Sequence, residues 1–223
     1  MRLPAQLQPP DAPYLCPSTL TESDQALNRL LNGNLEAMSS HLEEFCEAAA
    51  LRGFCMGQRT AVPDPHLFAR WEYLAARQCI VSLYNYREAM DAAHRTLTRQ
   101  PWAKHIDTKS LEVTKDAFRA EYPNTRELRQ TVLHDAERHA TPSRFDVNKV
   151  RDGRHLMTDG GGCLIELSGG STMTMGSCFV DNRYVSNFNG QVVELDLDFK
   201  KLERLVSLTQ DYYRAVDQQH LAT

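Results

Sequence analysis

The sequence predicts an α+β protein, mainly a helical bundle with a small antiparallel β-meander before the last helix. Apolar residues recur at intervals of three and four through most of the first 142 residues, which is the period of a helix with one buried face. Short apolar runs between glycines follow, and the helical period then returns. We expect one globular unit: a flexible proline-rich arm (1–20), a helical bundle (21–142), a β-meander (143–198) and a C-terminal helix packed on the bundle (199–223).

The N-terminal arm contains five prolines and lacks the basic start and unbroken apolar core of a signal peptide. We expect it to be flexible or extended. No apolar run approaches the roughly 20 residues that cross a bilayer, so no membrane span is expected. The six cysteines form no Cys-x-x-Cys pair, and we interpret them as reduced, mostly buried thiols. These features predict a cytoplasmic protein.

The first predicted helix runs from about Glu22 to Leu51, with Thr21 or Ser23 as its cap. Gly53 and Gly57 then break the pattern. Its buried stripe is expected to hold Leu27, Leu30, Leu31, Leu35, Met38, Leu42, Phe45 and Ala49. The second helix follows this break.

The second predicted helix has Asp64 as its N-cap and Pro65 at its first helical position, and it should stop before Pro101. Proline suits the first turn because its missing N–H would lack a partner there in any case. Its apolar side is expected to hold Leu67, Trp71, Leu74, Ile80, Val81, Tyr84, Met90 and Leu97.

Two shorter helices are predicted next. Asp107 or Thr108 caps the first of them, which should end at Tyr122 because the residue before a proline resists the helical region. Asn124 opens the following helix in a capping box with Glu127, and Pro142 closes it. The buried positions are expected to be Leu111, Ala117 and Phe118 in one helix and Leu128, Val132, Leu133 and Ala136 in the other.

The glycine-rich part predicts three or four strands in a meander. Asp181-Asn182 and Asn189-Gly190 are hairpin dipeptides that tolerate positive φ, and they separate runs 173–180, 184–188 and one that begins at Gln191. From about Phe199 the helical period returns. The stripe of this last helix is expected to hold Leu202, Leu205, Val206, Leu208, Tyr212 and Val216.

The charge pattern does not favour nucleic acid as the partner. The formal net charge is −4, although residues 94–129 hold eight Lys or Arg against five acids and so carry +3. Glycine clusters 160–162 and 169–170 lack the Lys-Ser/Thr of a phosphate-binding loop, so we interpret them as tight turns. Asp135 and His139 lie one helical turn apart, which suits either two metal ligands or a hydrogen-bonded surface pair. We expect no metal and no cofactor.

The strongest functional signal in the sequence is Arg129 followed, after four residues, by His134. Together with helix 71–92 and the break at Tyr122-Pro123, it resembles the HEPN-like superfamily of helical-bundle proteins, and the meander with its terminal helix resembles a bacterial group of that layout. This resemblance implies a homodimer in which Arg and His of both subunits meet and cleave RNA without metal. Arg129 would stabilise charge on phosphate, and His134 would act as general acid or base.

The residues also favour a different interpretation of the same helix. Arg126, Gln130, His134 and Arg138 lie on one face of an ideal helix, whereas Arg129 and His134 are about 140° apart. Gln130 also stands where active members of the superfamily carry a small polar residue. We therefore expect a non-catalytic binding or assembly module acting as a homodimer, with a protein partner favoured over RNA. The alternative is a metal-independent endoribonuclease of the toxin or defence type that uses Arg129 and His134.

Overall fold

The computed structural model describes residues 8–16, 21–59, 61–62, 65–100, 108–134, 141–147, 149–150, 156–157, 163–165, 173–174, 177–180 and 182–221 of the 223-residue chain. The chain divides into two compact units, one of residues 1–123 and 199–223 and the other of residues 124–198. The mostly helical α+β class is confirmed, and so is the small antiparallel sheet before the last helix. Among the described helices, none is long and apolar enough to cross a membrane.

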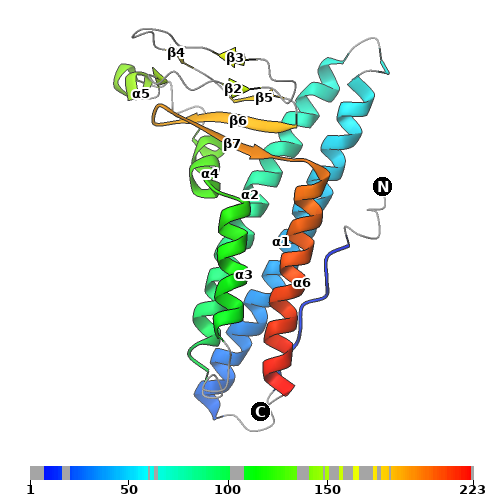
Figure 1. The fold of residues 1–223 in the computed structure, drawn as a ribbon, viewed down its shortest axis with the longest axis vertical. Coiled ribbons are helices and arrows are strands. Elements are labelled where there is room, and N and C mark those ends of the chain that lie inside the picture. Colours follow the sequence, from blue (N-terminus) through cyan, green and yellow to red (C-terminus); the bar gives the residue numbers. More distant parts are fainter. Residues whose placement is uncertain are drawn as a thin grey trace. The chain divides into compact units, whose positions relative to one another are not determined.

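The first unit contains α1 (Glu22–Arg59), α2 (His66–Leu97), α3 (Thr108–Glu121) and α6 (Phe199–Leu221). The two long helices α1 and α2 lie side by side, and α3 packs against α6 (Figure 1). Asn34, early in α1, is hydrogen-bonded to Thr96, late in α2, over 3.5 Å. Arg59, at the end of α1, reaches Glu72 near the start of α2, so the two helices run antiparallel.

The core of this unit confirms most of the predicted stripes. Five of the eight residues expected in the first stripe are buried, as are all six in the last helix. Three tyrosine hydroxyls attach α6 to the other helices. Tyr86 is hydrogen-bonded to Thr209 over 2.8 Å, Tyr213 donates to the carbonyl of Leu35 over 2.7 Å, and Tyr122 donates to the carbonyl of Lys201.

Three predictions about α1 and α2 are wrong. Helix α1 continues through Gly53 and Gly57 to Arg59. A glycine costs only about 1 kcal/mol in a helix, and this segment is anchored by the buried Cys55 and by the ion pair of Arg59 with Glu72 of α2. Leu67, Trp71 and Leu74 are exposed, although the period placed them in the buried stripe. Helix α2 begins at His66, with Pro65 as its N-cap rather than its first helical residue. Asp64, the expected cap, lies outside the described residues.

The second unit contains α4 (Thr125–Leu133), α5 (Pro142–Val147) and a three-stranded antiparallel meander. Its strands are β5 (Cys178–Val180), β6 (Arg183–Phe188) and β7 (Gln191–Asp196), in that order. Asn189 and Gly190 have φ of 50° and 78°, which confirms the predicted hairpin turn. At Gly190 a Cβ atom would lie 2.8 Å from the carbonyl oxygen of Lys149, so this position also requires glycine for space.

The remaining strands of this unit are short pairs outside the meander. Strand β1 (Lys149–Val150) pairs with β4 (Met173–Thr174), and β2 (Leu156–Met157) pairs with β3 (Cys163–Ile165). The run 173–180 is therefore two strands with different partners, because an alternating run shows which residues can be extended but not which strand they will pair with.

The structure corrects three details of the predicted fourth helix. Asn124 has φ 61° and makes no side-chain cap hydrogen bond, so the capping box with Glu127 does not form. The helix ends at Leu133, well before Pro142. Pro142 is the first residue of α5 instead of the stop signal, which fits the preference of proline for the first turn. Leu133, expected in the stripe, is exposed.

Candidate functional site

The two predicted catalytic residues lie in different settings: Arg129 is within α4, and His134 follows its last residue. This helix packs on β6 and β7 and buries Leu128, Thr131 and Val132. Arg129 follows Leu128 directly and is half-buried. Because Thr125 and Thr131 are buried as well, the polar side chains of α4 that stay partly or fully exposed are Arg126, Glu127, Arg129 and Gln130.

His134 is the C-cap of α4 and not part of the helix. Its φ of −109° and ψ of 25° lie outside the helical region, while its N–H still donates to the carbonyl of Gln130 over 3.0 Å. The His134 side chain is exposed. The face expected for Arg126, Gln130, His134 and Arg138 is therefore interrupted: Arg126 is exposed, Gln130 is half-buried, the helix stops before His134, and Arg138 lies outside the described residues.

Metal-ligand groupings do not stand out in the described part of the chain. Asp135 and His139, the pair with helical ligand spacing, lie outside it. Among the residues that are described, no group of three or more His, Cys, Asp or Glu is placed to hold a metal ion.

The thiols of α1 and α2 are buried and poorly reactive, whereas Cys16 of the N-terminal arm is exposed. Cys46, Cys55 and Cys79 are buried, as expected for small apolar side chains. Burial raises the pKa of Cys46 to about 12, with Glu43 and Glu47 adding to the effect. Burial likewise raises the pKa of Cys79 to about 12, although Arg52 acts in the opposite direction. A thiol must lose its proton to act as a nucleophile, so these side chains fill the core.

Charged residues bridge α2 and α3 around a buried histidine. Asp91 lies 3.4 Å from Lys115 and 3.1 Å from Arg119. One turn further along α2, His94 is only 8% exposed, and its Nδ1 has no hydrogen-bond partner among the described residues. Burial lowers the pKa of His94, the cation of Lys115 lowers it further, and Glu112 and Asp91 oppose the shift. The folded chain therefore disfavours the protonated form of His94.

We expect His94 to make the folded chain less stable in mild acid. Its pKa is lower when folded than when unfolded, so the unfolded chain binds a proton first and stability is lost as pH falls below about 6.5. The slope from this one group is at most about 1.4 kcal/mol per pH unit. Urea unfolding between pH 7.5 and 5 should show a smaller loss for His94→Gln than for the wild type.

The exposed His66 provides the control for that experiment. His66→Gln should keep the full pH dependence of the wild type. If His94→Gln and His66→Gln lose stability with falling pH in the same way as the wild type, the buried histidine does not control acid stability.

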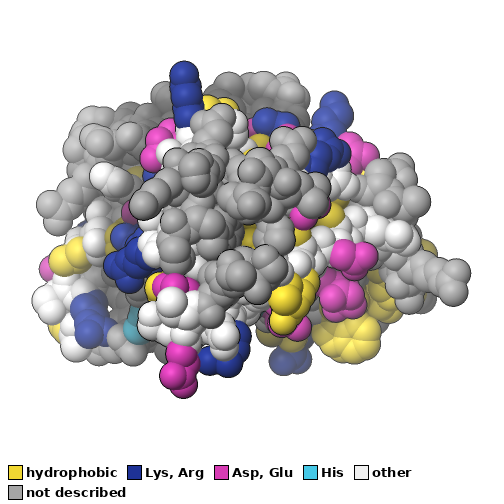
Figure 2. Space-filling model, turned by 90° about the horizontal axis from the view of Figure 1, so that it is seen from below, with side chains coloured by type: hydrophobic (Ala, Val, Ile, Leu, Met, Phe, Trp, Pro, Cys, Tyr) yellow, Lys and Arg dark blue, Asp and Glu magenta, His cyan; other side chains and the backbone are white. Residues whose placement is uncertain are grey.

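The surface carries charges of both signs rather than one strong field. Figure 2 shows Lys and Arg side chains interspersed with Asp and Glu over the face that it presents. Lys115 and Arg119 of α3 belong to the net-positive segment 94–129, and both form ion pairs with Asp91 of α2. A surface of this kind gives little general attraction for a polyanion.

An exposed apolar surface lies where α1 ends and α2 begins. We call it the aromatic patch, and it consists of Leu51, Phe54, Leu67, Phe68, Trp71 and Leu74. All but the half-buried Phe68 are exposed. The Phe68 ring connects the two helices, with its centroid 6.3 Å from that of Phe54 and 6.1 Å from that of Trp71, both edge to face. Contiguous apolar surface of this kind marks an interaction site more often than scattered exposed residues do.

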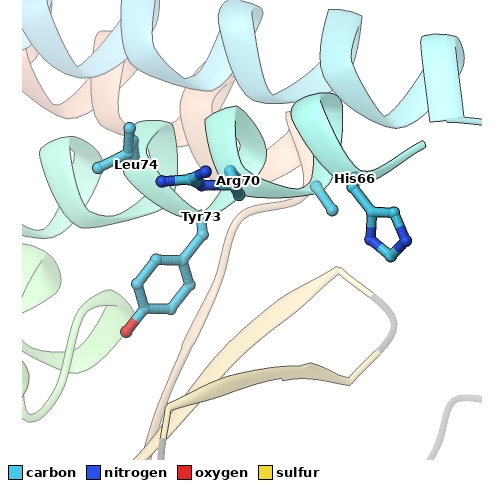
Figure 3. A pocket seen from close by; sticks show the side chains of 5 residues that line it. His66, Arg70, Tyr73 and Leu74 are labelled. Atoms are coloured by element: carbon cyan, nitrogen blue, oxygen red, sulfur yellow. The ribbon is translucent and has the colours of Figure 1, made fainter. Parts of the chain in front are cut away.

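Polar side chains of α2 border the aromatic patch. His66, Ala69, Arg70, Tyr73 and Leu74 line a hollow (Figure 3). They lie on successive turns of the helix, and Leu74 belongs to both the hollow and the patch. The Arg77 guanidinium lies 5.6 Å from the centroid of the Tyr73 ring. The spacing of apolar residues identifies one face of α2 as apolar, but it could not show that Leu67, Trp71 and Leu74 on that face are exposed.

The chain matches none of the protein-family models, curated proteins or solved structures with which it was compared.

Proposed function

We propose that this chain is a non-catalytic binding or assembly module of HEPN-like type that acts as a homodimer in the cytoplasm. The observation that carries this proposal is the aromatic patch. Phe54, late in α1, contacts Phe68 near the start of α2, and Phe68 contacts Trp71. The exposed Leu51, Leu67 and Leu74 lie within one helical turn of these rings in the sequence. Tryptophan and phenylalanine are also enriched in the buried centres of protein interfaces.

A second copy of the chain is the partner that this patch suits best. In a dimer with two-fold symmetry, one patch faces an identical patch, so apolar residues meet apolar residues without a second specialised surface. Arg70 and His66 border the patch and would form a polar rim that stays in water. The proposed dimer would therefore bury apolar surface while keeping its charged residues solvated.

We expect Leu74→Glu to weaken this dimer at least tenfold, because it places a carboxylate in an apolar interface. Val113→Glu is the matched control: Leu74 is 60% and Val113 61% exposed, but Val113 lies on α3, outside the patch. Sedimentation velocity over a range of micromolar concentrations measures both. A wild type that stays monomeric, or two variants that dissociate alike, would contradict the proposal.

The ribonuclease alternative is supported by the exposure of His134 and the partial exposure of Arg129, which leave both side chains accessible to an RNA phosphate. In this alternative, purified wild type would cleave single-stranded RNA with or without chelator. His134→Ala and Arg129→Ala would each lower the rate by about 10²–10⁴. Cleavage that needs metal would exclude this mechanism, and no cleavage at all would leave the binding module as the remaining proposal.

A further inference from the structure

The N-terminal arm packs against α1 through the backbone of Leu15, whose N–H and carbonyl oxygen are both hydrogen-bonded to α1. The N–H of Leu15 donates to Oδ1 of Asn32 over 3.0 Å. The carbonyl oxygen of Leu15 accepts from Nδ2 of Asn32 over 2.9 Å and from Nδ2 of Asn28 over 2.8 Å. The Leu15 side chain is only 1% exposed. Two asparagines of α1 thus bind the backbone of an extended segment while its leucine is buried beside them.

A second contact fixes the direction of the arm. Ser39, further along α1, donates from Oγ to the carbonyl oxygen of Pro10 over 3.0 Å. Residue 10 therefore lies near residue 39 and residue 15 near residues 28 and 32, so the arm runs antiparallel to α1. Residues 8–16 form no helix or strand, and their three prolines favour an extended backbone (Figure 1).

The arm lies in a groove between α1 and α6, and in the described part of the chain it leaves one polar atom of this groove without a hydrogen bond and part of its volume empty. Asn28 is only 8% exposed, yet its Oδ1 has no hydrogen-bond partner among the described residues. A buried acceptor without a donor is uncommon in native proteins. A hollow of about 370 Å³ also lies between residues 10–13 and α6. Its lining from α6 consists of Gln210, Tyr213, Arg214 and Asp217.

We propose that the groove between α1 and α6 is a binding site for an extended, proline-containing peptide of a partner protein, and that residues 8–16 occupy this site as a resident competitor. The partner peptide would carry a leucine five residues after a proline, as Leu15 follows Pro10. The arm would then regulate access, because a partner can bind only to the fraction of molecules in which the arm has left the groove.

The contacts explain why such a site would select a class of peptide and not one sequence. Asn28, Asn32 and Ser39 bind backbone atoms, which every peptide offers, while the buried leucine provides the side-chain selectivity. Proline lowers the conformational entropy that an extended peptide loses on binding. A partner peptide could also fill the hollow beside α6 and supply the donor that Oδ1 of Asn28 lacks. This inference goes beyond the homodimer and holds equally for a monomer.

The experiment uses full-length chains and a fluorescent peptide of residues 8–15, with fluorescence polarisation as the readout. Leu15→Asp in the chain should release the arm, because a carboxylate is not tolerated in an apolar site. We expect this variant to bind the peptide at least about tenfold more tightly than the wild type, whose groove is occupied. Adding Asn32→Ala to Leu15→Asp should reverse the gain, and a peptide with Asp in place of Leu15 should not bind.

Two outcomes of this experiment would overturn the proposal. A Leu15→Asp chain with unchanged far-ultraviolet circular dichroism that does not bind the peptide would overturn it. Equal peptide affinity of Leu15→Asp with and without Asn32→Ala would overturn it as well, because the peptide would then bind outside the groove. If Leu15→Asp does not fold, Leu15→Ala takes its place in the same comparisons. Sedimentation of the same samples reports the oligomeric state separately, so failure of the dimer and failure of the groove remain distinguishable.

Discussion

Replacing Glu72 with Gln is expected to lower the free energy of unfolding by about 3–5 kcal/mol, the usual effect of breaking a buried ion pair. Glu72 is 2% exposed and lies between two guanidinium groups. Its Oε1 is 3.7 Å from Nη2 of Arg52, which is itself buried, and its Oε2 is 2.7 Å from Nη1 of the half-exposed Arg59. Without the carboxylate, the buried Arg52 cation would lose the charge that balances it.

Urea unfolding of Arg59→Ala provides the matched control, because Arg59 binds the same carboxylate from the surface. Exposed ion pairs contribute about 0–1 kcal/mol, so this variant should lose far less stability than Glu72→Gln. Changing both buried partners together, Arg52→Met with Glu72→Leu, should recover most of the loss since neither charge remains buried. Equal losses for Glu72→Gln and Arg59→Ala would show that the surface partner, not the buried one, carries the interaction.

The spacing of apolar residues predicted burial correctly where neighbouring helices cover the whole apolar face of a helix. All six residues predicted for the stripe of α6 are buried, and α6 packs against α3 and α1. The same reasoning failed at the start of α2. Leu67, Trp71 and Leu74 have the helical spacing of a buried face but remain exposed. The spacing of apolar residues shows which side of a helix can be buried, while burial itself depends on what lies opposite.

Local signals were overridden where tertiary packing is strong. Gly53 and Gly57 should weaken a helix, yet α1 runs through both. Asn124 favours a side-chain cap, yet it adopts a left-handed conformation at the turn into α4 instead. Each of these preferences is worth about 1 kcal/mol or less, which the burial of a single large side chain can exceed.

The candidate sites differ in how far a sequence can reveal them. Arg129 and His134 can be selected from their spacing, although the sequence did not show that α4 ends between them. The groove for the arm could not be found in this way. It is formed by residues 8–16, by Asn28, Asn32 and Ser39 of α1, and by α6, and only the fold brings these segments together. Glu72 likewise carries no mark in the sequence of being a buried charge.

Phe118→Ala is expected to lower the free energy of unfolding by about 3–5 kcal/mol, because it removes a ring from a filled core and leaves a cavity. Phe118 is buried, and its ring centroid lies 5.4 Å from that of Tyr86 and 5.2 Å from that of Tyr122. Burial raises the pKa of both tyrosines, with Glu121 adding to the effect at Tyr122, so their hydroxyls stay protonated. Those hydroxyls are hydrogen-bonded to Thr209 and Lys201 of α6.

Because both neighbours of Phe118 bind α6, the cavity should also loosen this helix. Hydrogen exchange of α6 amides should therefore rise more in Phe118→Ala than the overall loss of stability requires, and Phe118→Leu, which keeps most of the volume, should lose clearly less stability than Phe118→Ala. Val113→Ala, at an exposed position of the same helix, should change stability by less than about 0.5 kcal/mol. A Phe118→Ala chain that unfolds at nearly the same urea concentration as Val113→Ala would mean that the aromatic cluster does not hold α6 in place.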